Sequence, residues 1–100
     1  MKIISWNEWL NGYIPYYEGE RHRDRFLDDP PKSVLIVYIL DRAVRHVSGE
    51  PWETWDDLNR RLQDCGYPCS PMFLERDTRQ EWYWAFWNDH DALLCMLKMG

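Results

Sequence analysis

A continuous apolar run inside residues 29–49 constrains the fold more than any other part of the chain. The segment opens on Asp29 and Pro30, which suit an N-cap and a first helical turn, and it closes on Gly49, which suits a C-cap. Apolar residues recur at helical spacing through and beyond the run, at Ile36, Leu40, Ala43 and Val47. We therefore predict a helix over residues 30–49. A buried strand at Val34–Leu40 is the alternative, because periodicity does not separate a short buried strand from a buried helix.

The chain length limits the protein to one domain, and the aromatic content indicates a protein partner. One hundred residues make a single domain, residues 1–100, with one core of modest stability. Seven Trp, six Tyr and three Phe bring more ring surface than such a core hides easily, since each ring carries about 150 to 250 Å² to bury. Some rings should lie at the surface, and Trp and Tyr are enriched in protein interfaces. The alternative is that a small domain uses large side chains to fill its core.

Charge and cysteine content argue against several classes of protein. Seventeen acidic against twelve basic residues give a net charge of −5, which disfavours direct binding to nucleic acid. The sequence has neither an apolar stretch long enough to cross a membrane nor a signal-peptide pattern, so we expect a cytoplasmic protein without a membrane partner. Three cysteines are an odd number and indicate reduced thiols.

The first third predicts a short helix followed by a long loop. Ser5-Trp6-Asn7-Glu8 has the form of a capping box, so a helix should begin there, after a brief strand at residues 1–4, and stop near Gly12. Residues 13–28 read as a loop, because Pro15 and Gly19 interrupt the periodicity and a mixed-charge run follows. Loops of this length are often functional, so we place candidate binding residues there.

The remaining segments predict two helices and a hairpin. Trp55, Leu58, Leu62 and Cys65 recur at helical spacing up to Gly66, so this helix and the one before it should form a helical hairpin over residues 30–65. Residues 72–76 and 80–87 are rich in strand formers and should pair, with residues 82, 84 and 86 on one face and residues 83, 85 and 87 on the other. The run Asn88-Asp89-His90-Asp91 should cap a final helix over residues 92–99.

The candidate chemistry is limited to one set of possible metal ligands. Cys65, Cys69, His90 and Cys95 are of the types that zinc takes, but their spacing matches neither a knuckle nor a finger. Cys65 and Cys95 read equally as small buried residues on helical faces. No cysteine–histidine nucleophile motif, phosphate loop or nucleotide fingerprint accompanies them. We therefore predict no metal, no cofactor and no enzyme activity.

The end of the chain, from Trp84 to Gly100, reads as an aromatic strand, an acidic cap, Asp91-Ala92 and an apolar segment. This order resembles the close of certain small phage-encoded proteins. It departs at Met96-Leu97-Lys98, where the phage pattern often has Phe-Lys-Leu. The resemblance implies a gene of a phage or mobile element, and it carries no activity, cofactor or catalytic residue.

Together these observations predict an α+β domain in which a helical hairpin packs on a small antiparallel sheet, with a short N-terminal helix and a C-terminal helix. The predicted function is a non-catalytic acidic module that binds a host protein, such as a nucleic-acid-binding complex, and inhibits it by occlusion, as anti-CRISPR proteins do. The predicted partner-binding residues combine exposed aromatics with surface acids. They are Tyr16, Tyr17, Glu18, Glu20, Trp52, Asp56, Asp57, Asp64 and Trp87. The alternatives are a homo-oligomeric structural or assembly protein and a small zinc-dependent nucleic-acid-binding protein.

Overall fold

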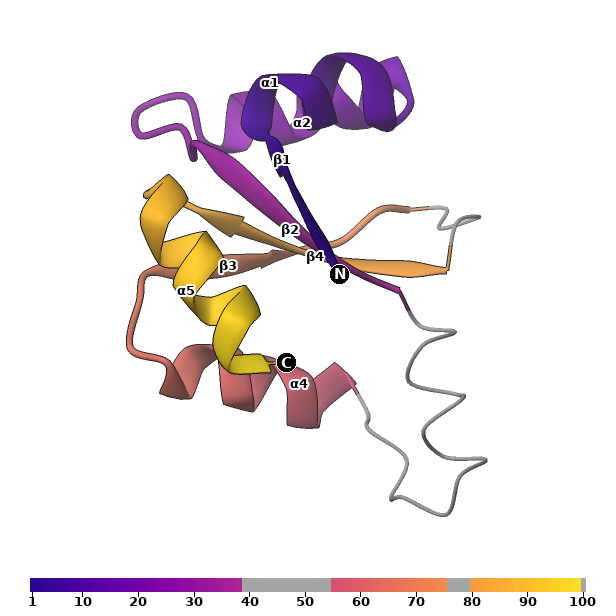
Figure 1. Cartoon of the computed structure of the whole chain (residues 1–100). Helices are drawn as coiled ribbons and strands as arrows, with labels where there is room; N and C mark the ends of the chain where they lie inside the picture. Colours follow the sequence, from indigo (N-terminus) through magenta and orange to yellow (C-terminus); the bar gives the residue numbers. More distant parts are fainter. Residues whose placement is uncertain (39–54, 76–79, 100) are drawn as a thin grey trace.

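The computed structural model describes residues 1–38, 55–75 and 80–99 of the chain. This part of the chain is an α+β fold, as predicted (Figure 1). In chain order its elements are β1 (Lys2–Ser5), α1 (Trp6–Glu8), the π-helix η1 (Trp9–Tyr13), α2 (Tyr16–Arg25), β2 (Ser33–Tyr38), α4 (Trp55–Asp64), β3 (Cys69–Met72), β4 (Glu81–Phe86) and α5 (Asp89–Met99).

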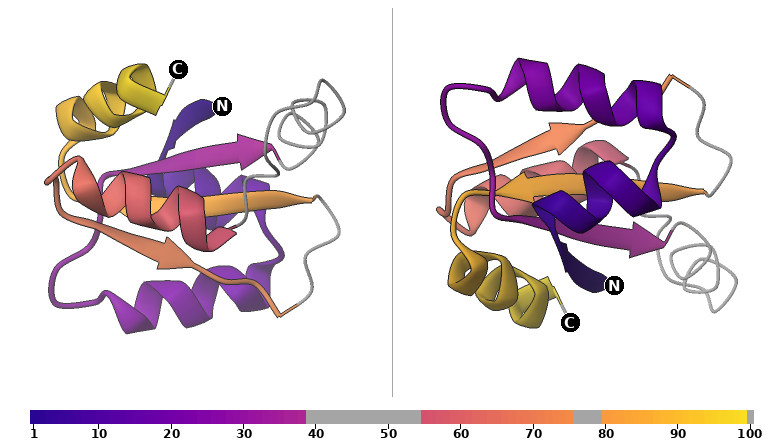
Figure 2. Two further views of the ribbon diagram at one scale, coloured as in Figure 1. Left: turned by 90° about the horizontal axis from the view of Figure 1, so that it is seen from below. Right: turned by 90° about the horizontal axis from the view of Figure 1, so that it is seen from above.

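The strands of the described residues form one antiparallel, four-stranded sheet in the order β1-β2-β4-β3. β2 and β4 occupy the centre, where Val34 pairs with Ala85 and Leu35 pairs with Trp84. Helices cover both faces of the sheet: α1 and α2 lie on one side, and α4 and α5 on the other (Figure 1). Seen from below and from above, α2 lies beside the β3 edge and α5 beside the β1 edge (Figure 2).

Alternation along the two central strands divides the apolar side chains between two cores. One core lies under α1, η1 and α2, and its buried residues are Trp6, Trp9, Leu10, Ile14, Val34, Ile36, Met72, Tyr83 and Ala85. The other lies under α4 and α5, and its buried residues are Leu35, Val37, Leu58, Leu62, Trp84, Phe86, Ala92, Cys95 and Met99. Because successive strand residues point to opposite faces, a strand covered by helices on both sides is apolar throughout.

The helix predicted over residues 30–49 is wrong where the structure describes it. Ser33–Tyr38 is strand β2, which is the alternative that the sequence left open. Its residues alternate between the two cores, so the run is apolar for a reason unrelated to helical periodicity. The first arm of the predicted helical hairpin is therefore a strand at these positions, and residues 39–49 lie outside the described residues.

The loop predicted over residues 13–28 is also wrong in its middle. Tyr16–Arg25 forms helix α2, which begins directly after Pro15. Gly19 permits this helix to pack on η1: a Cβ at this position would lie 2.4 Å from the backbone oxygen of Leu10. The glycine that suggested a loop therefore marks a close approach between two helices.

The other predicted boundaries agree with the structure to within a few residues. Ser5 Oγ accepts the backbone N–H of Glu8 at 3.1 Å, as the capping box predicts. Asn88 Oδ1 accepts the backbone N–H of His90 at 2.8 Å and so caps α5. Gly66 follows α4 with a φ of 82°, which suits glycine. The predicted hairpin pairs β3 with β4, but its first strand ends at Met72, where the prediction began it.

Candidate protein-interaction site

Polar side chains of α2 hold the segment that follows β3. Arg21 Nη2 donates to the backbone oxygen of Phe73 at 3.0 Å, and His22 Nε2 lies 3.1 Å from the same oxygen. Glu18 Oε1 accepts the backbone N–H of Glu75 at 2.9 Å. The last β3 residue that pairs with β4 is Met72, so residues 73–75 take their backbone partners from α2 and leave the sheet. The Phe73 carbonyl and the Glu75 N–H are therefore already paired and do not extend the open edge of the sheet.

The electrostatics of this contact depend on two buried side chains, Glu18 and His22. Glu18 Oε2 lies 2.6 Å from Arg21 Nη2, so the acid has a charged partner as well as a backbone donor. His22 donates through Nε2 to the Phe73 carbonyl, which leaves Nδ1 as an acceptor without a partner in the described residues. Burial is the main cause that lowers the pKa of His22, and the positive charge of Arg21 adds to it.

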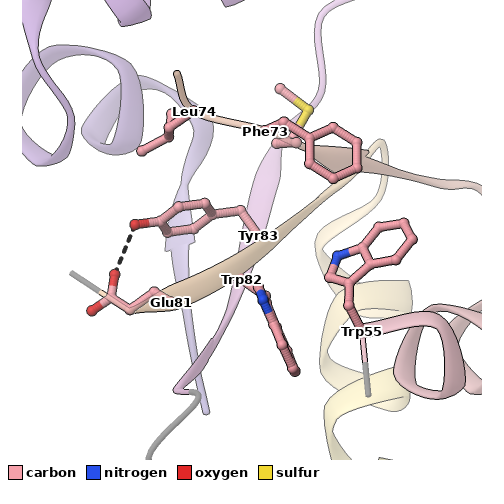
Figure 3. Close-up of a pocket in the computed structure, with 7 residues that line it drawn as sticks. Trp55, Phe73, Leu74, Glu81, Trp82 and Tyr83 are labelled. Atoms are coloured by element: carbon pink, nitrogen blue, oxygen red, sulfur yellow. Dashed lines mark hydrogen bonds between the residues drawn. The ribbon is translucent and has the colours of Figure 1, made fainter. Parts of the chain in front are cut away.

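A pocket opens where residues 73–74 separate from β4. Its volume is about 270 Å³, and Figure 3 shows the residues that line it. Aromatic rings make most of its walls, and one carboxylate lies at its end. The lining residues are Trp55, Met72, Phe73, Leu74, Glu81, Trp82 and Tyr83.

The carboxylate of this pocket belongs to Glu81 and is buried. The hydroxyl of Tyr13 donates to its two oxygens at 2.8 and 2.6 Å, and the hydroxyl of Tyr83 donates to Oε2 at 2.9 Å (Figure 3). Glu81 is the first residue of β4, and alternation places its side chain on the same face as Tyr83. Two phenols from separate elements therefore fix the orientation of the acid.

The opposite wall includes two rings in contact, those of Trp55 and Phe73. Trp55, at the start of α4, lies 5.3 Å from Phe73 and 5.9 Å from Trp84 between ring centroids. Phe73 is 56% exposed, although it contacts Trp55. A large apolar ring held at the mouth of a pocket is available for contact with another molecule.

The exposed side of α2 continues this aromatic surface. Tyr17 is 55% exposed and lies one helical turn before Arg21, whose guanidinium bonds to Phe73. We call Tyr17, Arg21 and Phe73 the α2 face. Tyr16 is 75% exposed at the start of the helix and donates to Glu20 at 2.7 Å. Arg, Tyr and other aromatic residues are the types that dominate binding energy in protein interfaces.

The structure separates the binding residues predicted from sequence into two groups. Tyr16, Tyr17 and Glu20 are exposed on α2, whereas Asp56, Asp57 and Asp64 belong to α4 on the opposite side of the sheet. Trp52 lies outside the described residues.

Two of the predicted binding residues have structural contacts. Glu18 was expected to be a surface acid, and this placement is wrong: it is 1% exposed and holds Glu75. Trp87 is half-buried, donates to the backbone oxygen of Asp29 at 2.8 Å and contacts the ring of Phe26. Both side chains therefore stabilise the fold where the prediction assigned them to a partner.

Sequence reasoning missed Arg21, Phe73 and Glu81. Arg21 was part of a charged run assigned to a loop, and Phe73 was assigned to a paired strand. Glu81 gave one usable signal, because an acid at the first position of an otherwise aromatic strand shares a face with Tyr83. The pocket forms because residues 73–75 diverge from β4. No local pattern in the sequence indicates this divergence.

The cysteines lie near one another in the core under α4 and α5. Cys95 is buried there, and Cys65 and Cys69 pack against it at partly buried positions. Burial is the main cause that raises the pKa of Cys95 to about 12, and hydrogen bonding with Cys65 adds to it. His90 is exposed in the first turn of α5. Within the described residues, no group of three or more His, Cys, Asp or Glu side chains is arranged to hold a metal ion.

No helix in the described part of the chain combines the length and apolar character needed to span a membrane. Comparisons of the chain with known protein families, with curated proteins and with solved structures found no match.

Proposed function

We propose that this protein is a non-catalytic binding module that engages a partner protein through the α2 face. The observation that carries the proposal is the bond from Arg21 Nη2 to the Phe73 carbonyl, which holds the residue with the exposed Phe73 ring against α2, one helical turn along the helix from the exposed Tyr17. Exposed aromatic rings around a positioned arginine are typical of interface hot spots. The pocket beside Phe73 offers a concave site within the same surface.

We further propose that the partner is a host protein and that binding inhibits it by occlusion in the cytoplasm. The resemblance of residues 84–100 to the ends of small phage proteins supports a phage or mobile-element origin. The net charge of −5 suits a partner with a basic surface, such as a nucleic-acid-binding complex. The acids of α4 lie away from the α2 face, so Asp56 and Asp64 would steer association rather than anchor it.

A pull-down from bacterial lysate tests the proposal. The bait is the tagged full-length protein, with and without nuclease, compared with the Tyr17→Ala/Phe73→Ala double variant. Both side chains are more than half exposed, so the double variant should keep its fold, which circular dichroism checks. Leu97→Ala is the matched control, because this exposed side chain lies on α5 across the sheet.

The proposal predicts a host protein enriched by the wild type and by Leu97→Ala, independent of nuclease, and lost with the double variant. Equal enrichment with all three baits would remove the α2 face from the interface. Enrichment that nuclease abolishes would instead indicate a nucleic-acid partner.

One observation favours a homo-oligomeric protein as the second candidate. Leu93 and Leu97 are exposed one turn apart on α5, so they form an apolar stripe on the side of the molecule away from α2. Sedimentation equilibrium of the wild type and of Leu93→Lys/Leu97→Lys tests it. A dimer that the double substitution dissociates would support self-assembly, and a monomeric wild type at all concentrations would contradict it.

A further inference from the structure

We propose that the pocket lined by Trp55, Phe73, Glu81, Trp82 and Tyr83 binds the cationic side chain of a lysine or arginine from the partner protein. The inference rests on the proposed protein-binding function and names what the partner inserts beside the α2 face. We call this site the Glu81 pocket.

The walls of the Glu81 pocket favour positive charge. Trp55, Phe73, Trp82 and Tyr83 contribute rings, and ring faces carry the negative part of the aromatic quadrupole. Trp and Tyr are among the rings that attract ammonium and guanidinium groups, and Trp does so most strongly. An anion would meet an acid in the same pocket, so the pocket disfavours phosphate or carboxylate ligands.

The acid adds a fixed negative charge at one end of the pocket. The phenols of Tyr13 and Tyr83 orient Glu81 and satisfy its oxygens, but neither phenol neutralises it. In the described residues Glu81 forms no ion pair, and Lys2 Nζ lies over the ring of Tyr13, 5.3 Å from its centroid. A cation that enters the pocket would therefore supply a charge partner that the described residues do not.

The size of the pocket limits the ligand to one side chain. About 270 Å³ is slightly below the range of roughly 300 to 1,000 Å³ typical of small-molecule sites. A lysine or arginine side chain has an apolar stem, which would lie along the rings of Phe73 and Tyr83, and a charged end, which would reach toward the Glu81 carboxylate beside the Tyr83 hydroxyl (Figure 3). A neutral alkyl chain would fill the same space but would offer the carboxylate no opposite charge.

Titration of the 15N-labelled full-length protein with blocked amino acids tests this inference. The probes are N-acetyl-lysine methylamide, N-acetyl-arginine methylamide, the neutral N-acetyl-norleucine methylamide and the acidic N-acetyl-glutamate methylamide. The readout is the indole N–H resonance of Trp55 and Trp82, each assigned from a Trp→Phe variant. We expect saturable shifts with a Kd on the order of millimolar for lysine or arginine, at least about tenfold tighter than for norleucine.

Two variants separate the contribution of the Glu81 charge to binding from the contribution of the aromatic rings. Glu81→Gln keeps the shape and an acceptor for the phenols, and it should weaken lysine binding about tenfold while leaving norleucine unchanged. Phe73→Ala removes an exposed ring with little risk to the fold and should weaken both cationic probes several-fold. His90→Ala, a change at an exposed residue of α5 outside the pocket, should bind as the wild type does. Norleucine or glutamate binding as tightly as lysine, or full lysine affinity in Glu81→Gln, would overturn the inference.

The outcome is separable from that of the pull-down. If the α2 face captures a partner and the pocket takes no cation, the inference fails and the proposed function stands. If the pocket takes cations but neither Tyr17 nor Phe73 affects capture, the proposed function fails, and the pocket is a site for free organic cations.

Discussion

The buried carboxylate of Glu18 accepts the backbone N–H of Glu75 at 2.9 Å, which ties the middle of α2 to the segment that follows β3. The same side chain pairs with Arg21, and Arg21 in turn holds the carbonyl of Phe73. The position of residues 73–75, and with it the opening of the Glu81 pocket, therefore depends on the polar side chains of one helix.

Removal of the Glu18 carboxylate should both destabilise the fold and release residues 73–75. Glu18→Ala leaves the Glu75 N–H without its acceptor and removes the closer of the two acidic partners of Arg21, the other being Glu75, and we expect a loss of about 3 kcal/mol in the free energy of unfolding. Urea denaturation measures the loss, and hydrogen exchange at the Glu75 amide reports the local release. Glu20→Ala is the control, because its carboxylate is exposed and bonds to Tyr16; it should cost less than about 0.5 kcal/mol. Equal costs for the two variants would contradict the role of Glu18.

Two glycines on adjacent helices should respond in opposite directions to alanine. A Cβ at Gly19 would lie 2.4 Å from the Leu10 backbone oxygen, so Gly19→Ala must push α2 away from η1, at a cost of about 2 kcal/mol. A Cβ at Gly12 would meet nothing within 4 Å, and Gly12→Ala should stabilise the protein by about 0.5 kcal/mol through lower chain entropy. Thermal and urea unfolding of the two variants check the signs. A neutral Gly19→Ala would mean that α2 does not pack on η1 as described.

The two errors in the predicted fold have separate physical causes. β2 lies at the centre of a sheet that helices cover on both faces, so Val34 to Val37 are all buried and show no alternation to distinguish a strand from a buried helix. α2 has few apolar residues, and tertiary contacts of Glu18, Gly19 and His22 rather than an apolar stripe hold it in place. Local sequence patterns indicate neither the helices that cover both faces of β2 nor the tertiary contacts that hold α2.

The alternation of β4 shows what the sequence could predict. Trp84 and Phe86 enter one core, and Tyr83 and Ala85 enter the other, as the period of two indicated. The caps at Ser5, Asn88 and Gly66 also follow from short-range chemistry and were predicted correctly. The candidate site was not predictable in the same way, because Arg21, Phe73 and Glu81 meet only through contacts between distant parts of the chain.

The thiols of Cys69 and Cys95 should be nearly inert in the native protein. Burial raises the pKa of Cys69 to about 11 and that of Cys95 to about 12, so little reactive thiolate is present at pH 8. For Cys69, a rise from the usual value of 9.0 lowers the thiolate fraction by about a hundredfold. Iodoacetamide labelling read by peptide mass spectrometry should show both cysteines unmodified in the native state and modified in guanidinium. Cys69 labelling as fast in the native protein as in the unfolded one would contradict this prediction.

Stability should fall as the solution becomes mildly acidic, through His22. Burial and the charge of Arg21 lower its folded-state pKa below the ordinary value of 6.5, so the unfolded chain takes up the proton first. The contribution of neutral His22 is therefore complete above pH 6.5 and decreases as the pH falls through 6.5 toward the lowered pKa. Midpoints of urea denaturation between about pH 7.5 and 5.5 give the slope of stability against pH. This interval lies above the range in which most carboxylates titrate. His22→Gln should flatten the slope, although it also lowers overall stability, whereas the exposed His90→Gln should leave it unchanged. A slope that survives in His22→Gln would assign the pH dependence to another group.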